Sequence, residues 1–142
     1  MRARALSWLI GVAGLWLLAG CGHLDSAPPG AADRVLSGVV TTNNGGGELP
    51  PGTEVSVRIV DLSRGEGRGE VLAEDTITNP GRMPVAFRLE YRAEDVVLMR
   101  SVNMEARVAV GGRLRYTTTG GHPITLSNVN DSHVVLVELA NR

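Results

Sequence analysis

The sequence lacks several residue types on which common protein chemistries depend. It contains no lysine and no glutamine, and its single cysteine is Cys21. Without lysine no Schiff base can form, which excludes one class of covalent catalysis. Both tryptophans lie within the first 16 residues, and the rest of the chain holds three aromatic residues: Phe87, Tyr91 and Tyr116. A single-strand nucleic-acid groove gains about 1–3 kcal/mol per base stacked on an aromatic ring, so no such groove is expected.

The N-terminal residues have the pattern of a secretory signal. Arg2 and Arg4 precede an uncharged stretch that runs from Ala5 to Gly20. A charged start, an apolar stretch and small residues before a cleavage point are typical of signal peptides. The stretch is short for a permanent anchor, since a spanning helix needs about 20 apolar residues.

The single cysteine makes this signal more specific. Leu18, Ala19 and Gly20 before Cys21 resemble the bacterial lipobox, the recognition site of the lipoprotein signal peptidase. We expect cleavage before Cys21, a diacylglycerol on its thiol and an acyl chain on its new amino group. An ordinary cleavage site would leave an unpaired thiol in an oxidising compartment, which is uncommon. Gly22 is not the aspartate that retains many lipoproteins in the inner membrane, so the periplasmic face of the outer membrane is predicted.

The sequence therefore divides into three parts. Residues 1–20 are the predicted signal peptide, 21–33 the lipidated cysteine and a flexible linker, and 34–142 one domain. Loss of Arg2 and Arg4 moves the formal charge from −1 to −3. A slightly acidic domain does not suit a phosphate-tracking surface, so no nucleic-acid partner is expected.

Short valine-rich runs separated by glycine, proline and asparagine predict an all-β domain from Arg34 onward. The expected strands are 35–42, 54–62, 71–78, 83–91, 102–110, 114–119 and 133–140, with 96–99 as a further strand or a helical turn. Half-buried strands must cover one another, so the predicted fold is a two-sheet β-sandwich of seven to eight strands. In the clearest alternation Phe87 points inward and Arg88 outward.

One hairpin can be predicted in register. Core positions suggest that a three-residue loop, Gly111 to Arg113, pairs Val110 with Leu114 and Val108 with Tyr116. A two-residue loop would instead place Val110 opposite Arg113.

An ordered series of stretches resembles one family. LSGVV, LPPGTEVSVRIVDLS, MPVAFRLEY, EARVAVGGRLRYTT and HPITL fall between Val35 and Leu139. They resemble the YbaY-type bacterial lipoproteins, which are related to the YscW-type lipoprotein chaperones of secretion systems. The resemblance implies a periplasmic β-sandwich lipoprotein without catalytic residues. YscW-type members act as pilotins, which escort secretin subunits to the outer membrane. Val102 stands where the family often has an aromatic residue.

Several candidate sites have simpler explanations. His122, His133 and Asp131 are possible metal ligands, but their spacing matches no standard zinc pattern, so no metal is expected. Asp131, Ser132 and His133 contain the residue types of a nucleophilic triad, yet neighbours in a turn cannot form its relay. A turn before the last strand is the favoured interpretation.

Other features are also weak signals. The methionines Met83, Met99 and Met104 suggest a soft-metal site, although core packing explains them better. Glycines 45–47 and the GEGRG stretch could cradle a phosphate, but no helix start follows them. Glu94 and Asp95 could form a catalytic pair or simply a charged turn. No catalytic residue is predicted.

The sequence thus favours a non-enzymatic envelope lipoprotein that binds another protein through a sheet edge or a groove. The first and last strands are the candidate edges, because chain ends often lie at sheet margins. Two alternatives stay open: a pilotin for a secretin, and a small-ligand carrier or enzyme of envelope metabolism. No cofactor is expected apart from the covalent lipid on Cys21, and the oligomeric state stays open.

The lipobox generates the first testable prediction. The Cys21→Ser variant should accumulate as unprocessed precursor and take up no labelled fatty acid, because a hydroxyl cannot form the thioether. Metabolic acyl labelling and the apparent mass on a gel measure both effects. Normal maturation and labelling of this variant would contradict the assignment.

Overall fold

The computed structural model describes residues 30–63, 69–98 and 100–140, which contain seven strands. The strands are β1 (Arg34–Thr41), β2 (Thr53–Asp61), β3 (Glu70–Thr78), β4 (Val85–Tyr91), β5 (Val102–Val110), β6 (Arg113–Thr118) and β7 (Ser132–Leu139). Every expected strand has an observed counterpart whose ends differ by two residues or fewer. In the additional segment, residues 96–98 form neither strand nor helix, and residue 99 lies outside the described residues. None of the described segments is a helix with the length and hydropathy needed to cross a membrane.

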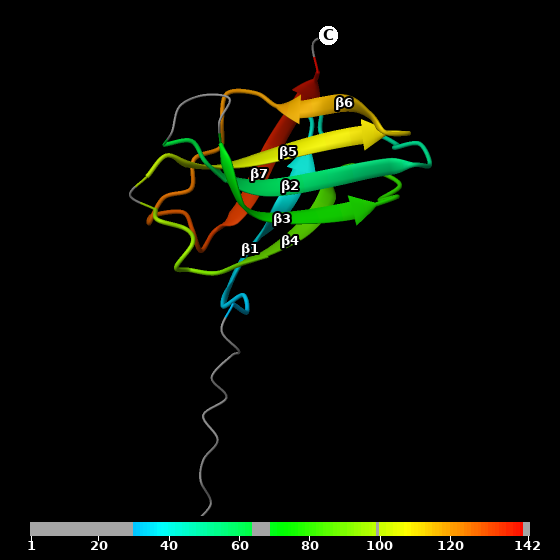
Figure 1. The fold of residues 1–142 in the computed structure, drawn as a ribbon. Coiled ribbons are helices and arrows are strands. Elements are labelled where there is room, and N and C mark those ends of the chain that lie inside the picture. Colours follow the sequence, from blue (N-terminus) through cyan, green and yellow to red (C-terminus); the bar gives the residue numbers. More distant parts are fainter. Residues whose placement is uncertain (1–29, 64–68, 99, 141–142) are drawn as a thin grey trace, which may run out of the picture.

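The expected two-sheet sandwich is not confirmed, because the strands form one sheet in the order β3-β2-β5-β6-β7-β1-β4. A short ladder from Tyr116 to Thr118 of β6 joins what would otherwise be two sheets. The joined sheet curls until its edge strands, β3 and β4, lie side by side (Figure 1). The result is nearly closed and barrel-like, with the apolar faces of both halves turned toward one core.

The first strand lies inside the sheet. β1 pairs in parallel with β7 and antiparallel with β4, so Gly38 lies opposite both His133 and Phe87. A Cβ atom at Gly38 would overlap the carbonyl oxygen of His133. Only glycine allows this approach, although its φ angle is ordinary for a strand.

The hairpin between β5 and β6 corrects the predicted register. Gly111 and Gly112 have φ angles of 57° and 77°, the values that a two-residue type I′ turn requires. Val110 therefore pairs with Arg113, so the three-residue loop was wrong. The expected partner of Val108 is nevertheless confirmed as Tyr116, because a register shift between Val108 and Ala109 absorbs the additional residue as a bulge.

The core consists of the inward residues of the alternating strands. β4 alternates between buried and exposed positions over its whole length. Phe87 is 5% exposed, which confirms its predicted burial. It packs in one apolar cluster with residues from the other half of the sheet: Val55, Val57, Ile59, Met104, Ala106 and Val108.

Burial of Phe87 generates a prediction on stability. The Phe87→Ala variant should lower the free energy of unfolding by about 3–5 kcal/mol, which is enough to unfold a marginal domain. Arg88→Ala is the matched control, because that side chain is 70% exposed and its contact with Glu90 is 3.8 Å long. The control should change stability by less than about 0.5 kcal/mol. Urea unfolding measures both, and equal losses would show that the inward face is misassigned.

Candidate functional site

The free edges of the sheet are not the predicted ones. The first and last strands were expected at the margins, but β1 and β7 are both interior, and the edges are β3 and β4. The parallel pairing of β1 with β7 causes this difference, since it places the first and last strands side by side in the interior of the sheet. The two real edges face each other across the seam of the sheet (Figure 1). A strand from a partner protein could pair with β3 or β4 only after these two edges had separated.

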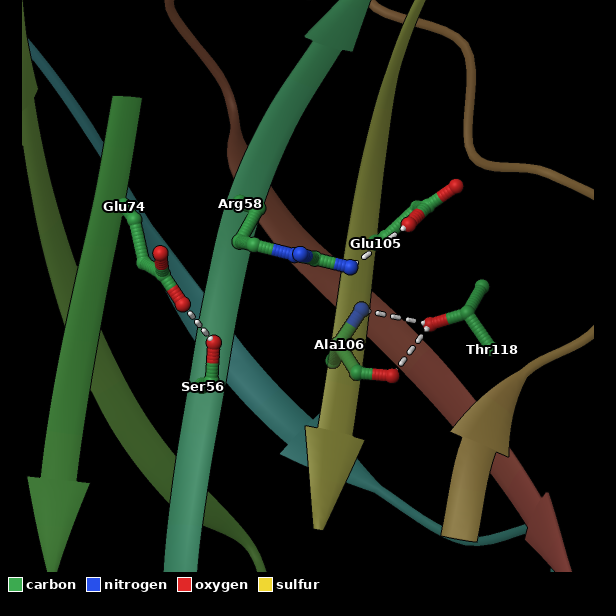
Figure 2. Close-up of polar contacts among 6 residues, drawn as sticks. All are labelled: Ser56, Arg58, Glu74, Glu105, Ala106 and Thr118. Atoms are coloured by element: carbon green, nitrogen blue, oxygen red, sulfur yellow. Dashed lines mark hydrogen bonds and ion pairs between the residues drawn. The ribbon is translucent and has the colours of Figure 1, made fainter. Parts of the chain in front are cut away.

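The backbone ladder between β5 and β6 ends at the pair of Arg107 with Thr117. β6 ends at Thr118, whose side chain continues the ladder in place of a backbone: the Ala106 N–H donates to Thr118 Oγ1 over 2.7 Å, and the hydroxyl donates to the Ala106 carbonyl over 3.2 Å (Figure 2). The chain then detours through two glycines and returns to β5, where the Met104 N–H donates to the His122 carbonyl. His122 is thereby placed beside β7.

The two histidines proposed as metal ligands do meet. His122 Nε2 and His133 Nδ1 lie 3.0 Å apart, and their rings are nearly perpendicular. His133 is 4% exposed, and its Nε2 has no hydrogen-bond partner among the described residues. Burial lowers the pKa of both imidazoles, and the charge of His122 lowers that of His133 further, against the opposing effect of Asp131. The folded structure therefore favours the neutral form of both imidazoles.

The same geometry bears on the metal and triad hypotheses. In the part of the chain that the structure describes, no three histidine, cysteine or acidic side chains are grouped as metal ligands. Within Asp131, Ser132 and His133, the ring nitrogen that a triad carboxylate would bind instead contacts His122. The three neighbours form no catalytic relay.

The acidic pair of the sequence is a charged turn. Arg92 holds Asp95 through two hydrogen bonds of 2.6 and 2.7 Å and contacts Glu94 at 3.2 Å. These hydrogen bonds lower the pKa of Asp95, whereas a general acid needs a raised one. The cleft next to them also contains Asp61, whose pKa is lowered by hydrogen bonds from Ser63.

The remaining candidates also have structural roles. Met104 is fully buried in the core, and Met83 is 4% exposed, while Met99 lies outside the described residues. Gly46 has a φ of 129°, and a Cβ there would come within 2.6 Å of the Met83 carbonyl oxygen. The glycines thus let the β1–β2 loop pack against the segment before β4. Most of the GEGRG stretch, like the lipobox and Cys21, lies outside the described residues.

The best candidate for binding is a cleft that sequence analysis missed. We call it the β7 cleft; it lies where β1 has ended and β7 continues, and its volume is about 360 Å³. The β1–β7 ladder stops at Leu136, whereas β7 runs to Leu139. The cleft is lined by residues from five segments: 42–44, 46–49, Met83, Tyr116 and 137–139.

Apolar and acidic side chains share the β7 cleft. Leu49 and Tyr116 are half-buried there, while Leu139 is 67% exposed. Glu48 and Glu138 supply two carboxylates, and Asn43 Nδ2 donates to Glu138 Oε1 over 3.1 Å. The arrangement suits binding of a partner's side chains better than chemistry, since no nucleophile faces a base.

Comparisons with known proteins place the fold in context. A family model described as type III secretion system lipoprotein chaperone (YscW) matches residues 31–136. One similar solved structure is an alternative pilotin from the type II secretion system of Vibrio cholerae, with a TM-score of 0.67 and 22% identity over 77% of this chain and 98% of that one. At this identity the likeness shows the fold alone. No curated protein matched the sequence. The YscW part of the resemblance is confirmed, and its YbaY part stays a prediction.

The histidine pair generates a prediction on pH dependence. The folded pKa values lie below the ordinary 6.5, so as the pH falls below about 6.5 the unfolded chain binds protons that the folded chain does not. Stability should therefore decrease between pH 7.5 and 5. The carboxyls of Asp61 and Asp95 titrate below this window, since their pKa values lie under 3.8.

Urea unfolding at a series of pH values measures this effect. His133→Asn should flatten the pH dependence whatever it does to absolute stability, because the buried titrating ring is gone. His23→Asn, a histidine before the domain, is the matched control and should keep the wild-type slope. An unchanged slope in His133→Asn would exclude the pair as its source.

Proposed function

The chain belongs to the YscW family of type III secretion system lipoprotein chaperones, and from this membership we propose that it is a pilotin that escorts a secretin to the outer membrane. The family match carries the proposal, because it extends over most of the described domain. The similarity in fold to a pilotin of a type II system agrees with it. Among the interpretations of the sequence, this favours the pilotin over a general binding module.

The described side chains support binding rather than catalysis. The acidic pair at Glu94 and Asp95 is neutralised by Arg92, and the histidine pair is buried against the sheet. We therefore propose a non-enzymatic role, with a protein segment as the ligand.

The proposed anchor is lipid on Cys21. Each buried methylene contributes about 0.8 kcal/mol, so two or three chains would hold the protein at a membrane. The linker enters the domain at Arg34, where β1 begins, whereas the β7 cleft follows the other end of β1 at Thr41 (Figure 1). The β7 cleft therefore lies at the opposite end of β1 from the linker.

The β7 cleft is the proposed contact surface for the secretin. It is open in the isolated chain, whereas the β3 and β4 edges already lie against each other. A partner can fill the cleft without the free-energy cost of separating two strands. Confinement to one membrane raises the effective concentration, so even a micromolar contact would be occupied there.

Loss of the gene tests the proposed function. Without this protein, secretin subunits should remain in the inner-membrane fraction and fail to form multimers. The wild-type gene should restore both properties, whereas a soluble form with an ordinary signal peptide and no Cys21 should bind the secretin but leave it mislocalised. Membrane fractionation and detergent-resistant multimers on gels are the measurements. Normal outer-membrane multimers in the deletion strain would refute the proposal.

A further inference from the structure

Among the described residues, the two carboxylates of the β7 cleft form no ion pair, although Arg82 lies opposite Glu48 in an isolated β-bridge. Arginine contacts Asp61, Glu90, Asp95 and Glu105 at 2.6 to 3.8 Å. In the described part of the chain, Glu48 and Glu138 form no ion pair, and the cleft lining contains no arginine. A chain with 14 basic residues for 15 acidic ones has thus left this cleft acidic.

We infer that the β7 cleft binds a client segment that inserts a large apolar side chain and places an arginine or lysine between Glu48 and Glu138. The inference rests on the proposed function and names the chemistry of the segment that this chaperone recognises. It assigns two residues, on opposite ends of the domain's sequence, as the determinants of specificity.

The apolar half of the motif follows from the cleft lining. The apolar wall of the cleft, which includes Tyr116, is completed by Leu49, Met83 and Val137. A volume of about 360 Å³ lies at the lower end of the range for binding pockets, about 300–1,000 Å³, so it fits one or two side chains. Leu139, which is largely exposed, would be covered by the inserted side chain.

The cationic half follows from charge complementarity. A guanidinium between two carboxylates makes charge-assisted hydrogen bonds, and an ammonium serves as a point charge in the same place. An acidic client residue would be repelled by both carboxylates. The cleft therefore selects against acidic segments as well as for basic ones.

Polar groups at the rim favour a peptide over a small cation. β7 extends past its β1 partner, so Val137 to Leu139 have a strand only on the β6 side. Asn43 and Asn44 border the same cleft with amide side chains. These backbone and amide groups can form hydrogen bonds with the backbone of a bound peptide. A polyamine or a metal ion has no peptide backbone to form them.

Selection from a displayed library of random dodecapeptides on the lipidated full-length protein in detergent tests the inference. Enriched peptides should combine leucine, phenylalanine or methionine with arginine or lysine. A synthetic copy of one such peptide, measured by fluorescence anisotropy, should lose about tenfold in affinity for the Glu48→Gln/Glu138→Gln double variant. Glu54→Gln removes an exposed carboxylate outside the cleft and should bind the peptide as the wild type does.

A second substitution on the peptide makes the result specific. Replacing its arginine with neutral citrulline should cost a similar factor for wild-type protein and almost nothing more for the double variant, because the two changes remove one interaction. The Leu139→Ser variant should bind every one of these peptides with lower affinity. The inference would be overturned if the two substitutions lowered the affinity independently of each other. It would also be overturned if the enriched peptides contained no cation, or if the selection enriched no peptide.

The outcome separates this inference from the proposed function. If the double variant still delivers the secretin and binds peptides normally, the inference fails and the escort function stands. If peptides bind as expected but the deletion strain assembles its secretin normally, the specificity of the cleft stands and the proposed client is wrong.

Discussion

The close approach of β1 and β7 at Gly38 is the constraint on which the rest of the structure depends. A side chain at Gly38 would collide with the backbone of His133, so only glycine allows the parallel ladder between the two strands. That ladder places β1 and β7 in the interior of the sheet and leaves β3 and β4 as the edges of a sheet that curls around one core. The ladder ends where Thr41 pairs with Leu136, and β7 continues beyond it without β1. The β7 cleft lies at this place.

Local sequence pattern predicted the strands and their inward faces well. In β4 every second residue is buried, as the alternation around Phe87 indicates. The pattern failed where two local solutions compete: after Val110 the sequence allows either a longer loop or a tight Gly111–Gly112 turn with a later bulge. Both place Tyr116 inward, so burial could not choose between them, and the geometry of the glycines decided.

The arrangement of the sheet could not be predicted in the same way. Alternation shows that a strand has a buried face, but it does not name the strand beside it. The parallel pair of β1 and β7 joins residues almost 100 positions apart, as in the pairing of Val39 with Val134. The β7 cleft has the same origin, since Glu48 and Glu138 are unremarkable until the fold brings their segments to one rim. The histidines were noticed, but their contact depends on the detour after Thr118.

The interior position of β7 also has a consequence in time. The chain is synthesised from its N-terminus, yet β1, the first strand to be made, needs β7, the last, as a partner. Pairings so distant in sequence are slow to form and leave early strands exposed meanwhile. The domain therefore completes its sheet only after its last strand is available, and a truncation before Ser132 would leave β1 and β6 without the strand that joins them.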